Sequence, residues 1–216
     1  DPCRGVESLV ITESRFEGQP DDLAPILARA IAGDPAAWRI VVDRYGRRLF
    51  ALAKSRCRDA DVAEDITQSV FATVAAKLSR GEYTEEGKFE SWLFRVAVNR
   101  IRDHIRRVRR QPVTTDSELV ASASLRPPSG DQDPIDPTAV GRLREALQQL
   151  NELDREVVEL RHHGGMSFKQ MAEVLDEPMG TLLARHHRAL RKLKSLLEAG
   201  VHPSTSPLAQ PSSERL

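Results

Sequence analysis

The sequence predicts an all-α protein of two small helical domains joined by a flexible, proline-rich, acidic linker, the C-terminal domain containing a helix-turn-helix. Two observations lead to this fold class. Apolar residues recur at steps of three and four over most of 23–108 and again over 140–197, which is the spacing of amphipathic helices. Between these stretches the periodicity disappears and five prolines occur between residues 112 and 137. No segment alternates with a period of two for long enough to indicate a strand.

Four helices are expected in the N-terminal domain. Asp34 followed by Pro35 marks one helix start, because a carboxylate caps free amides and proline needs no partner at the first position. The second helix is expected to bury an apolar stripe that includes Val42, and the fourth helix one that includes Phe89, Leu93, Ala97 and Val108. The expected helices are residues 23–32, 35–57, 61–78 and 88–110.

The remaining boundaries follow from composition. We expect a mobile tail, the N-terminal domain, the linker, the C-terminal domain and a disordered tail at residues 1–20, 21–111, 112–137, 138–199 and 200–216. The linker's excess of acidic residues suits a cationic channel and equally an ordinary tether.

In the C-terminal domain helical spacing restarts behind Asn151, which is expected to cap that helix, and the domain ends in a predicted helix-turn-helix. Ser167 and Gln170 have the spacing of a capping box for a short first helix. Asp176 and Glu177 then form the turn, and Pro178 begins a second helix. In such a unit the N-terminal part of the second helix enters the DNA major groove.

Exposed residues of that second helix are the candidates for reading bases, and those further along for holding phosphate. Gly180 would let the backbone approach the duplex. A basic helical hairpin that is merely a solvated face is the alternative. The candidate DNA-contacting residues of this domain are Ser167, Gly180, Thr181, Leu183, Ala184, Arg185, His187, Arg188, Arg191 and Lys192.

Charge and cysteine usage narrow the class of protein. The chain is formally neutral, yet residues 95–110 contain seven arginines against Asp103 alone, which indicates a cationic surface. Two distant cysteines, Cys3 and Cys57, fit a reducing cytoplasm and no disulfide framework. No apolar run approaches a membrane span. Adjacent histidines on a helix point apart, so no metal site is expected, and no cofactor is implied.

Three segments in order carry a family resemblance: "AEDITQSVFATVAAKL", "FESWLFRVAVNRIRDHIRR" and "LDREVVELRHHGGMSFKQMAEVLDEPMGTLLARHHRALRKL". Together they resemble regions 2 and 4 of bacterial RNA polymerase sigma factors of the extracytoplasmic-function group. The resemblance implies a factor that binds core RNA polymerase and directs it to a two-part promoter. The C-terminal domain would read the −35 element as duplex. The family often has glycine where Asp176 stands and leucine where His186 stands, so base preferences do not transfer.

The resemblance also implies that the N-terminal domain holds the −10 element as a single strand. The loop 79–87 would form the rim of a base pocket, and Trp92 is expected to be core rather than a stacking platform. The implied −10 residues are Lys88, Ser91, Arg95, Asn99, Arg100, Asp103, Arg106, Arg107 and Arg110.

The implied protein partners are the coiled coil of the largest polymerase subunit, the flap of the second-largest subunit and an inhibitory anti-sigma protein. An acidic helix face that is simply solvated is the alternative to docking on the coiled coil. The implied docking residues are Asp61, Glu64, Asp65, Gln68 and Phe71.

Two other function classes account for less of the sequence. A stand-alone helix-turn-helix regulator would bind duplex tightly without polymerase, but it leaves the basic helix at 95–110 without a task. An enzyme with a helix-turn-helix appendage is disfavoured, because the sequence shows no nucleophile with a base, no glycine-rich phosphate loop and no ligand cluster.

Overall fold

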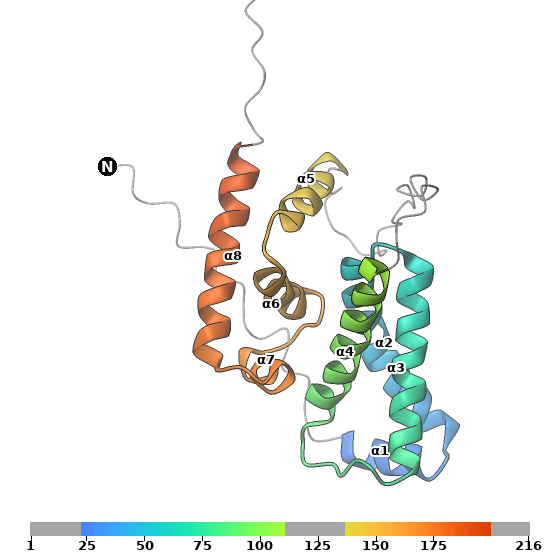
Figure 1. The fold of residues 1–216 in the computed structure, drawn as a ribbon. Coiled ribbons are helices and arrows are strands. Elements are labelled where there is room, and N and C mark those ends of the chain that lie inside the picture. The colour runs from blue at the N-terminus through green and yellow to red at the C-terminus, as the bar shows by residue number, and fades with distance from the viewer. Residues whose placement is uncertain (1–22, 111–136, 200–216) are drawn as a thin grey trace, which may run out of the picture.

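A computed structural model describes residues 23–110 and 137–199, and within these ranges every regular element is an α-helix (Figure 1). The all-α prediction is therefore confirmed for the described residues. The predicted tails and linker lie outside them, apart from Pro137, which begins a helix. The helices are α1 (Leu23–Ile31), α2 (Pro35–Cys57), α3 (Ala60–Ser79), α4 (Phe89–Arg110), α5 (Pro137–Gln148), α6 (Glu152–His162), α7 (Phe168–Leu175) and α8 (Met179–Ala199).

Aspartates begin two helices of the N-terminal unit, α1–α4. The Asp34 carboxylate accepts the Ala36 N–H at 2.8 Å, as its place before Pro35 predicts. At α3 the cap is Asp59, which accepts the backbone N–H groups of Asp61 and Val62. The helix therefore begins one residue earlier than the sequence pattern indicates.

The core of this unit lies between α2, α3 and α4. Its largest fully buried side chains include Tyr45, Leu49, Phe89 and Leu93. Tyr45 and Phe89 pack with their ring centroids 5.8 Å apart.

Two expected core residues are exposed instead. Val42 is 41% exposed and Val108 is 53% exposed. Val42 follows Val41, which takes the buried position on α2, and the last five residues of α4 (106–110) are all exposed. The apolar stripe of α4 therefore runs beyond the helices that cover it.

In the C-terminal unit, α5–α8, a second set of caps begins the helices. The Asn151 side chain accepts the Asp154 N–H at the start of α6. Ser167 and Gln170 form the predicted capping box of α7, with the side chain of each accepting the backbone N–H of the other. Both predictions from the sequence are confirmed.

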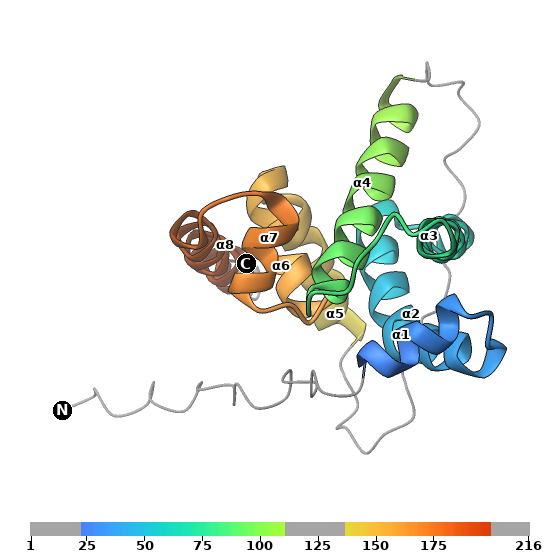
Figure 2. The ribbon, with the colours of Figure 1, turned by 90° about the horizontal axis from the view of Figure 1, so that it is seen from below.

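The two units pack directly against each other. Helix α7 lies against α4 and α6 against α2, so the two halves stand side by side in both views (Figures 1 and 2). One cluster of buried apolar residues runs from Leu52 and Val98 of the N-terminal unit to Leu160 and Met171 of the C-terminal unit. Helix α4 is consequently buried on a second side, at Phe94 and Val98.

Candidate nucleic-acid interface

Helices α7 and α8 are joined by a tight turn. Asp176 ends α7 with φ of 56°, in the left-handed region, and its N–H donates to the Ala172 carbonyl. The Pro178 carbonyl then accepts the Thr181 N–H at 2.9 Å, which starts α8. The second helix therefore begins only a few residues after the first ends, as a helix-turn-helix requires.

Helix α8 buries one line of residues and exposes the opposite line. Leu182, Ala189 and Leu193 are buried. The space around Gly180 is open, so a partner's backbone can approach closely there. The exposed residues of the first four turns include the predicted Thr181, Leu183, Ala184, His187, Arg188 and Arg191.

The cations of α8 differ in their partners. Arg188 makes two hydrogen bonds, at 2.8 and 2.5 Å, to the buried carboxylate of Asp154 on α6, and this arginine holds the pKa of Asp154 below its usual value. Arg185 donates to Glu177 at 2.8 Å, and Lys192 donates to the Gln149 carbonyl.

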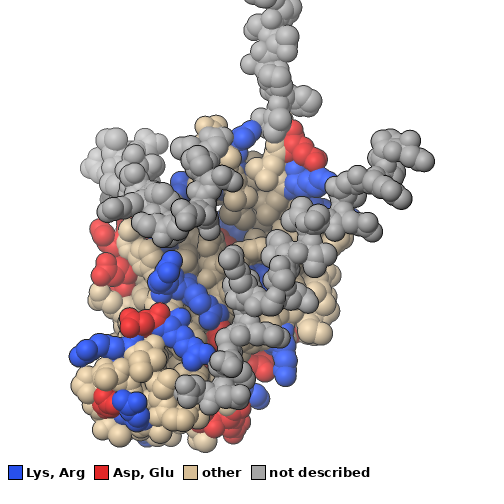
Figure 3. Space-filling view, turned by 180° about the vertical axis from the view of Figure 1, so that it is seen from behind, with Lys and Arg blue, Asp and Glu red and all other residues tan. Residues whose placement is uncertain are grey.

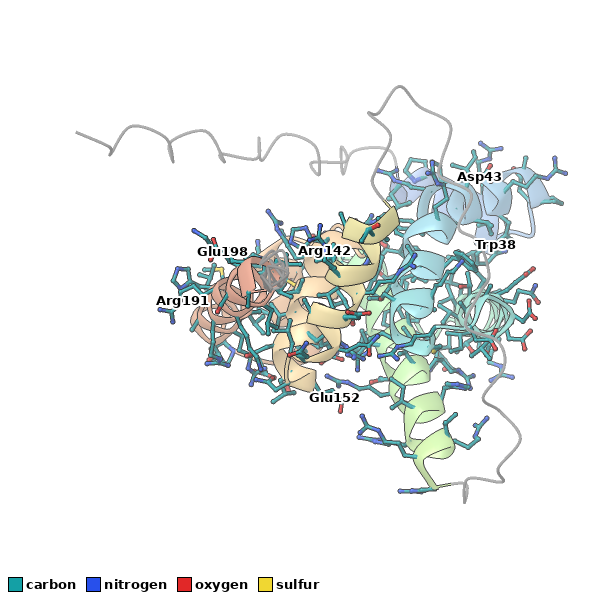
Figure 4. All side chains as sticks on the ribbon, turned by 90° about the horizontal axis from the view of Figure 1, so that it is seen from above. Trp38, Asp43, Arg142, Glu152, Arg191 and Glu198 are labelled. Carbon is teal, nitrogen blue, oxygen red and sulfur yellow. The ribbon has the colours of Figure 1, made fainter. Side chains whose placement is uncertain are left out.

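Arg191, in contrast, has no hydrogen-bond or ion-pair partner within the described ranges and points outward from α8 (Figure 4). Of the four predicted cations, it is therefore the one that a phosphate reaches without displacing a protein partner.

The second predicted nucleic-acid surface lies on the outer side of α4. Asn99, Arg100, Asp103 and the last arginines are exposed, as predicted. An open groove is lined by Asp103, Arg106, Arg107 and Arg110. Asp103 Oδ1 lies 3.7 Å from Arg106 Nη1, and exposed pairs of this kind contribute little. Since three arginines line the groove with one aspartate, the groove keeps an excess of positive charge.

Two predicted members do not belong to this open face. Ser91 is buried, with 7% of its surface exposed, because it lies on the side of α4 that faces the core. Arg95 is exposed but its guanidinium donates to the Glu173 carbonyl of α7. Helical spacing alone did not reveal that α7 covers this part of α4.

An aromatic cluster braces the loop between α3 and α4. Tyr83 stacks on Trp92 with ring centroids 4.3 Å apart, and Phe89 packs against both rings. The Tyr83 hydroxyl donates to Glu85, and burial together with this bond raises the pKa of Tyr83. Trp92 is half-buried against the core, which agrees with the expectation that it is core.

The outer side of α3 carries the predicted acidic residues. Asp61, Glu64, Asp65 and Gln68 are all exposed, and Gln68 donates to Glu64 at 3.1 Å. Phe71 differs, because its ring is half-buried against the core beside Gly46. The four polar residues thus form one accessible face, and Phe71 contributes only its edge.

Charge over the rest of the surface is mixed. On the face shown in Figure 3, basic side chains gather with acidic side chains among them. In the described ranges no three potential ligands come close enough to hold a metal ion, and no helix there is long and apolar enough to cross a membrane.

Comparison with known proteins identifies the family. The model for sigma-70 region 2 matches residues 41–111, and that for sigma-70 region 4 matches residues 141–193. RNA polymerase sigma factor CarQ of Myxococcus xanthus is 32% identical over 165 residues, which cover 76% of this chain and 91% of CarQ. The chain belongs to the extracytoplasmic-function group of the sigma-70 family.

Other relatives agree with this assignment. The sigma-H factor of Pseudomonas aeruginosa is 28% identical over 184 residues, or 80% of this sigma factor and 92% of the relative. A solved structure of CnrH in complex with the cytosolic domain of CnrY aligns with a TM-score of 0.60 and 26% identity, covering 81% of this chain and 96% of that one.

Family membership assigns the function at the level of the whole chain. This sigma factor directs promoter-specific transcription initiation by RNA polymerase. The alternative of a stand-alone regulator has less support, because the basic helix and the helix-turn-helix fall within the two sigma regions in the family's order.

The sequence did not reveal the carboxylates that hold helix α8 in place. Asp154 and Glu177 bind Arg188 and Arg185, yet neither was a candidate. Asp154 lies 34 residues before Arg188, so no local pattern links them. A buried aspartate calls for a cationic partner, but the burial of Asp154 is known only from the structure, so the sequence offered no signal for this pair.

Proposed function

We propose that the two helical units of this sigma factor each read one promoter element. The C-terminal unit (138–199) would bind the −35 element as intact duplex, and the N-terminal unit (21–111) would hold the −10 element as a single strand. The observation that carries this division is the exposed face of α8, which presents Gly180, Ala184, His187 and Arg191. The opposite face of the helix is buried against the rest of the C-terminal unit.

At the −35 element, small and apolar side chains suit contact with thymine methyl groups, and Leu183 and Ala184 are exposed for it. Arg191 and Lys192 would hold phosphate, with the hydroxyl of Ser167 near the start of α7. Arg185 and Arg188 could contact DNA only after breaking their hydrogen bonds to Glu177 and Asp154, respectively. We therefore expect them to contribute less than Arg191.

At the −10 element, the groove at the C-terminal end of α4 would supply cations for the strand backbone, and the loop braced by Tyr83 and Trp92, before the N-terminal end of α4, would form the rim of a base pocket. Lys88 lies next to this loop, and Asn99 and Arg100 lie on α4 between the loop and the groove. Ser91 is left out of this assignment because it is buried.

We further propose three protein partners. The exposed acidic face of α3 would dock on the largest polymerase subunit, and the C-terminal unit on the flap of the second-largest. An inhibitory anti-sigma protein would be the third, since CnrH was solved with the cytosolic domain of CnrY.

We place the protein in the cytoplasm, where its DNA is. We assign the bond-making chemistry of transcription to the polymerase.

Run-off transcription tests the proposal. Purified core polymerase with this sigma factor should give discrete 5′ ends on fragmented genomic DNA that share two upstream motifs. Changing Arg106 and Arg107 together to Ala should weaken permanganate reactivity at the start site while leaving binding to core polymerase intact. Equal reactivity in that variant and the wild type would remove the α4 groove from promoter opening.

A further inference from the structure

Four of the six histidines of the chain form two adjacent pairs, and the fold brings the two pairs together. His162 and His163 lie where α6 ends, and His186 and His187 lie in the middle of α8. Of the four, only His187 belongs to the promoter contacts proposed above. The other three have no role in the proposed function, although they lie on or beside the helix that carries it.

His186 joins α8 to two other helices through ring contacts. Its ring stacks on that of His162 of α6, with the ring centroids 5.8 Å apart and the planes inclined by 23°. The ring of Phe168, the first residue of α7, meets it edge-on at 5.3 Å. The Arg161 guanidinium extends this stack, 5.3 Å from the centre of the Phe168 ring. Helices α6, α7 and α8 thus meet at His186.

The ionisable groups around His186 are all basic. His162 and Arg161 of α6 and His187 of α8 act on its charge. Helix α7 presents the uncharged Phe168, and α5, which also packs on α8, presents no charged group to it within the described ranges. The buried Nε2 atom of His186 has no hydrogen-bond partner there either. Burial and the basic neighbours lower the pKa of His186 below its usual value, so the packed arrangement requires a neutral ring.

His186 lies at the level of the residues that are proposed to read bases. It is one turn from the buried Leu182 and Ala189 on either side, so it belongs to the side of α8 that packs on the C-terminal unit. Ala184 and His187 lie at the same level on the exposed side. Because contacts at a binding site require placement within about 0.5 Å, even a small displacement of the helix at His186 would disturb them.

Protonation of His186 would place a charge where no partner offsets it. A buried charge without a partner is strongly unfavourable, so the helix shifts to bring the ring into water. In water the ring has a pKa of about 6.5, above that in the packed arrangement, so proton uptake below this pH favours the displaced arrangement. Burial also lowers the pKa values of His162 and His163, which therefore act in the same direction. Acid thus loosens the junction of α6, α7 and α8.

We propose that His186 is a positioning residue that makes recognition of the −35 element depend on pH. With a neutral ring, His186 holds α8 in the orientation that reads bases. With a charged ring, the stack with His162 and Phe168 opens and this orientation is lost. The inference deepens the proposed function and rests on it, because the orientation matters only if α8 reads the −35 element.

The pH profile of promoter discrimination tests the role of His186. The polymerase–sigma complex would be bound to a promoter found by run-off transcription and to the same promoter with its −35 motif scrambled. Acid adds positive charge, which strengthens binding to every duplex, so the readout is the ratio of the two dissociation constants. Between pH 7.5 and pH 5.5 the wild type should lose about five-fold in this ratio, since one unit of pKa difference changes an equilibrium about ten-fold.

Three single variants identify the group responsible. His186→Leu should remove most of the loss, because leucine keeps an apolar contact with Phe168 and takes up no proton. His162→Leu should reduce the loss without removing it, since His186 then has one basic neighbour fewer. His104→Gln is the matched control, because it removes a histidine of α4, outside the C-terminal unit, and it should lose as much as the wild type. Thermal melting at pH 7.5 checks that each variant is folded.

Two results would overturn the positioning role of His186. An equal loss in the wild type and His186→Leu would assign the pH dependence to His187, which meets DNA directly in the proposed function. A ratio that does not change with pH in the wild type would exclude any such dependence. Failure of the wild-type complex to distinguish the two promoters at pH 7.5 would instead contradict the reading of the −35 element by α8, and with it the proposed function.

Discussion

Arg58 and Asp176 have φ of 61° and 56°, in the left-handed region that favours glycine. Each ends a helix, and each donates its N–H to a carbonyl four residues earlier, Lys54 or Ala172. A side chain with a Cβ is strained there, and aspartate tolerates the conformation better than most because it bonds locally. The two helix ends therefore need this conformation, although neither residue is the best suited to it.

Replacing these residues should change stability in opposite directions. Arg58→Gly should raise the free energy of unfolding by about 0.5–1 kcal/mol, because the strain is removed at an exposed position. Asp176→Ala should lower it by about 1 kcal/mol, whereas Asp176→Gly should not. Urea denaturation measures all three. A stabilising Asp176→Ala would show that the turn relaxes out of the left-handed region.

Gly164 meets a different constraint, which is space. A Cβ at this position would lie 2.5 Å from the Leu160 carbonyl oxygen, an approach that the backbone must move to relieve. Gly164→Ala should therefore cost about 1–3 kcal/mol of unfolding free energy. Gly141→Ala is the matched control, since nothing lies within 4 Å of a Cβ there, and helix α5 should gain about 0.5–1 kcal/mol. Thermal melting compares the two.

His186 makes stability depend on pH. Burial lowers its pKa below 6.5, with His162 and Arg161 adding to the effect, and its buried Nε2 has no partner within the described ranges. As pH falls below 6.5 the unfolded chain takes up the proton before the folded one, so stability falls. Burial raises the pKa of Glu159, which acts in the opposite direction.

His186→Leu should reduce this dependence. The leucine keeps the packing on Phe168 and cannot be protonated. The difference in unfolding free energy between pH 7.5 and pH 5.5 should be smaller in the variant than in the wild type. The same difference in both proteins would assign the acid sensitivity to other groups, such as His162 and His163, whose pKa values burial also lowers.

At the scale of the element, α8 is held in place by its own cations. Arg188 is fixed on Asp154 and Arg185 on Glu177, so these two arginines orient the helix in the free protein. Arg191 makes no such contact within the described ranges. Arginines of one helix thus differ in role: two position the helix, and the third is free for the DNA contact proposed above.

Salt titration of DNA binding should separate these roles. Arg191→Ala should weaken binding of the polymerase–sigma complex equally across promoter sequences and lower the salt slope by about 1, because one phosphate contact is lost. Arg188→Ala should lower the melting temperature, since it leaves the buried Asp154 charge unpaired. If Arg191→Ala changed sequence preference instead, Arg191 would be a base contact.

Helix α4 shows why an element's surroundings are hard to predict. Its pattern correctly predicts burial at Phe89, Leu93 and Ala97, but not at Phe94 and Val98. Those two residues lie on a second side of the helix, which the C-terminal unit contacts. Helical periodicity assigns one buried face to a helix. The number of buried residues is therefore underestimated for a helix that packs between two layers.

At the scale of the whole molecule, one apolar cluster joins both units, which predicts that they unfold together. Calorimetry at low salt should show one transition for the wild type. Arg102→Glu should give two, because each unit then unfolds with its own helices. Two transitions already present in the wild type and unchanged in the variant would show that the units are energetically independent.

Local patterns predicted the helices, most of their caps and the class of protein. Period, proline and cap residues act over a few positions, so the Asn151 cap, the Ser167 capping box and the helix-turn-helix were all predicted correctly. The order of the motifs predicted the family, and the exposed faces of α3, α4 and α8 followed from helical spacing.

How the two units meet could not be predicted from local patterns. Pairs such as Arg102 with Glu156 are 54 residues apart, and Arg48 is 116 residues from Gly164. No local pattern joins residues across such separations, because charge complementarity between surfaces depends on which faces come together. For the same reason only the structure revealed the partners of Arg185 and Arg188, the burial of Ser91, and the packing of the two units against each other.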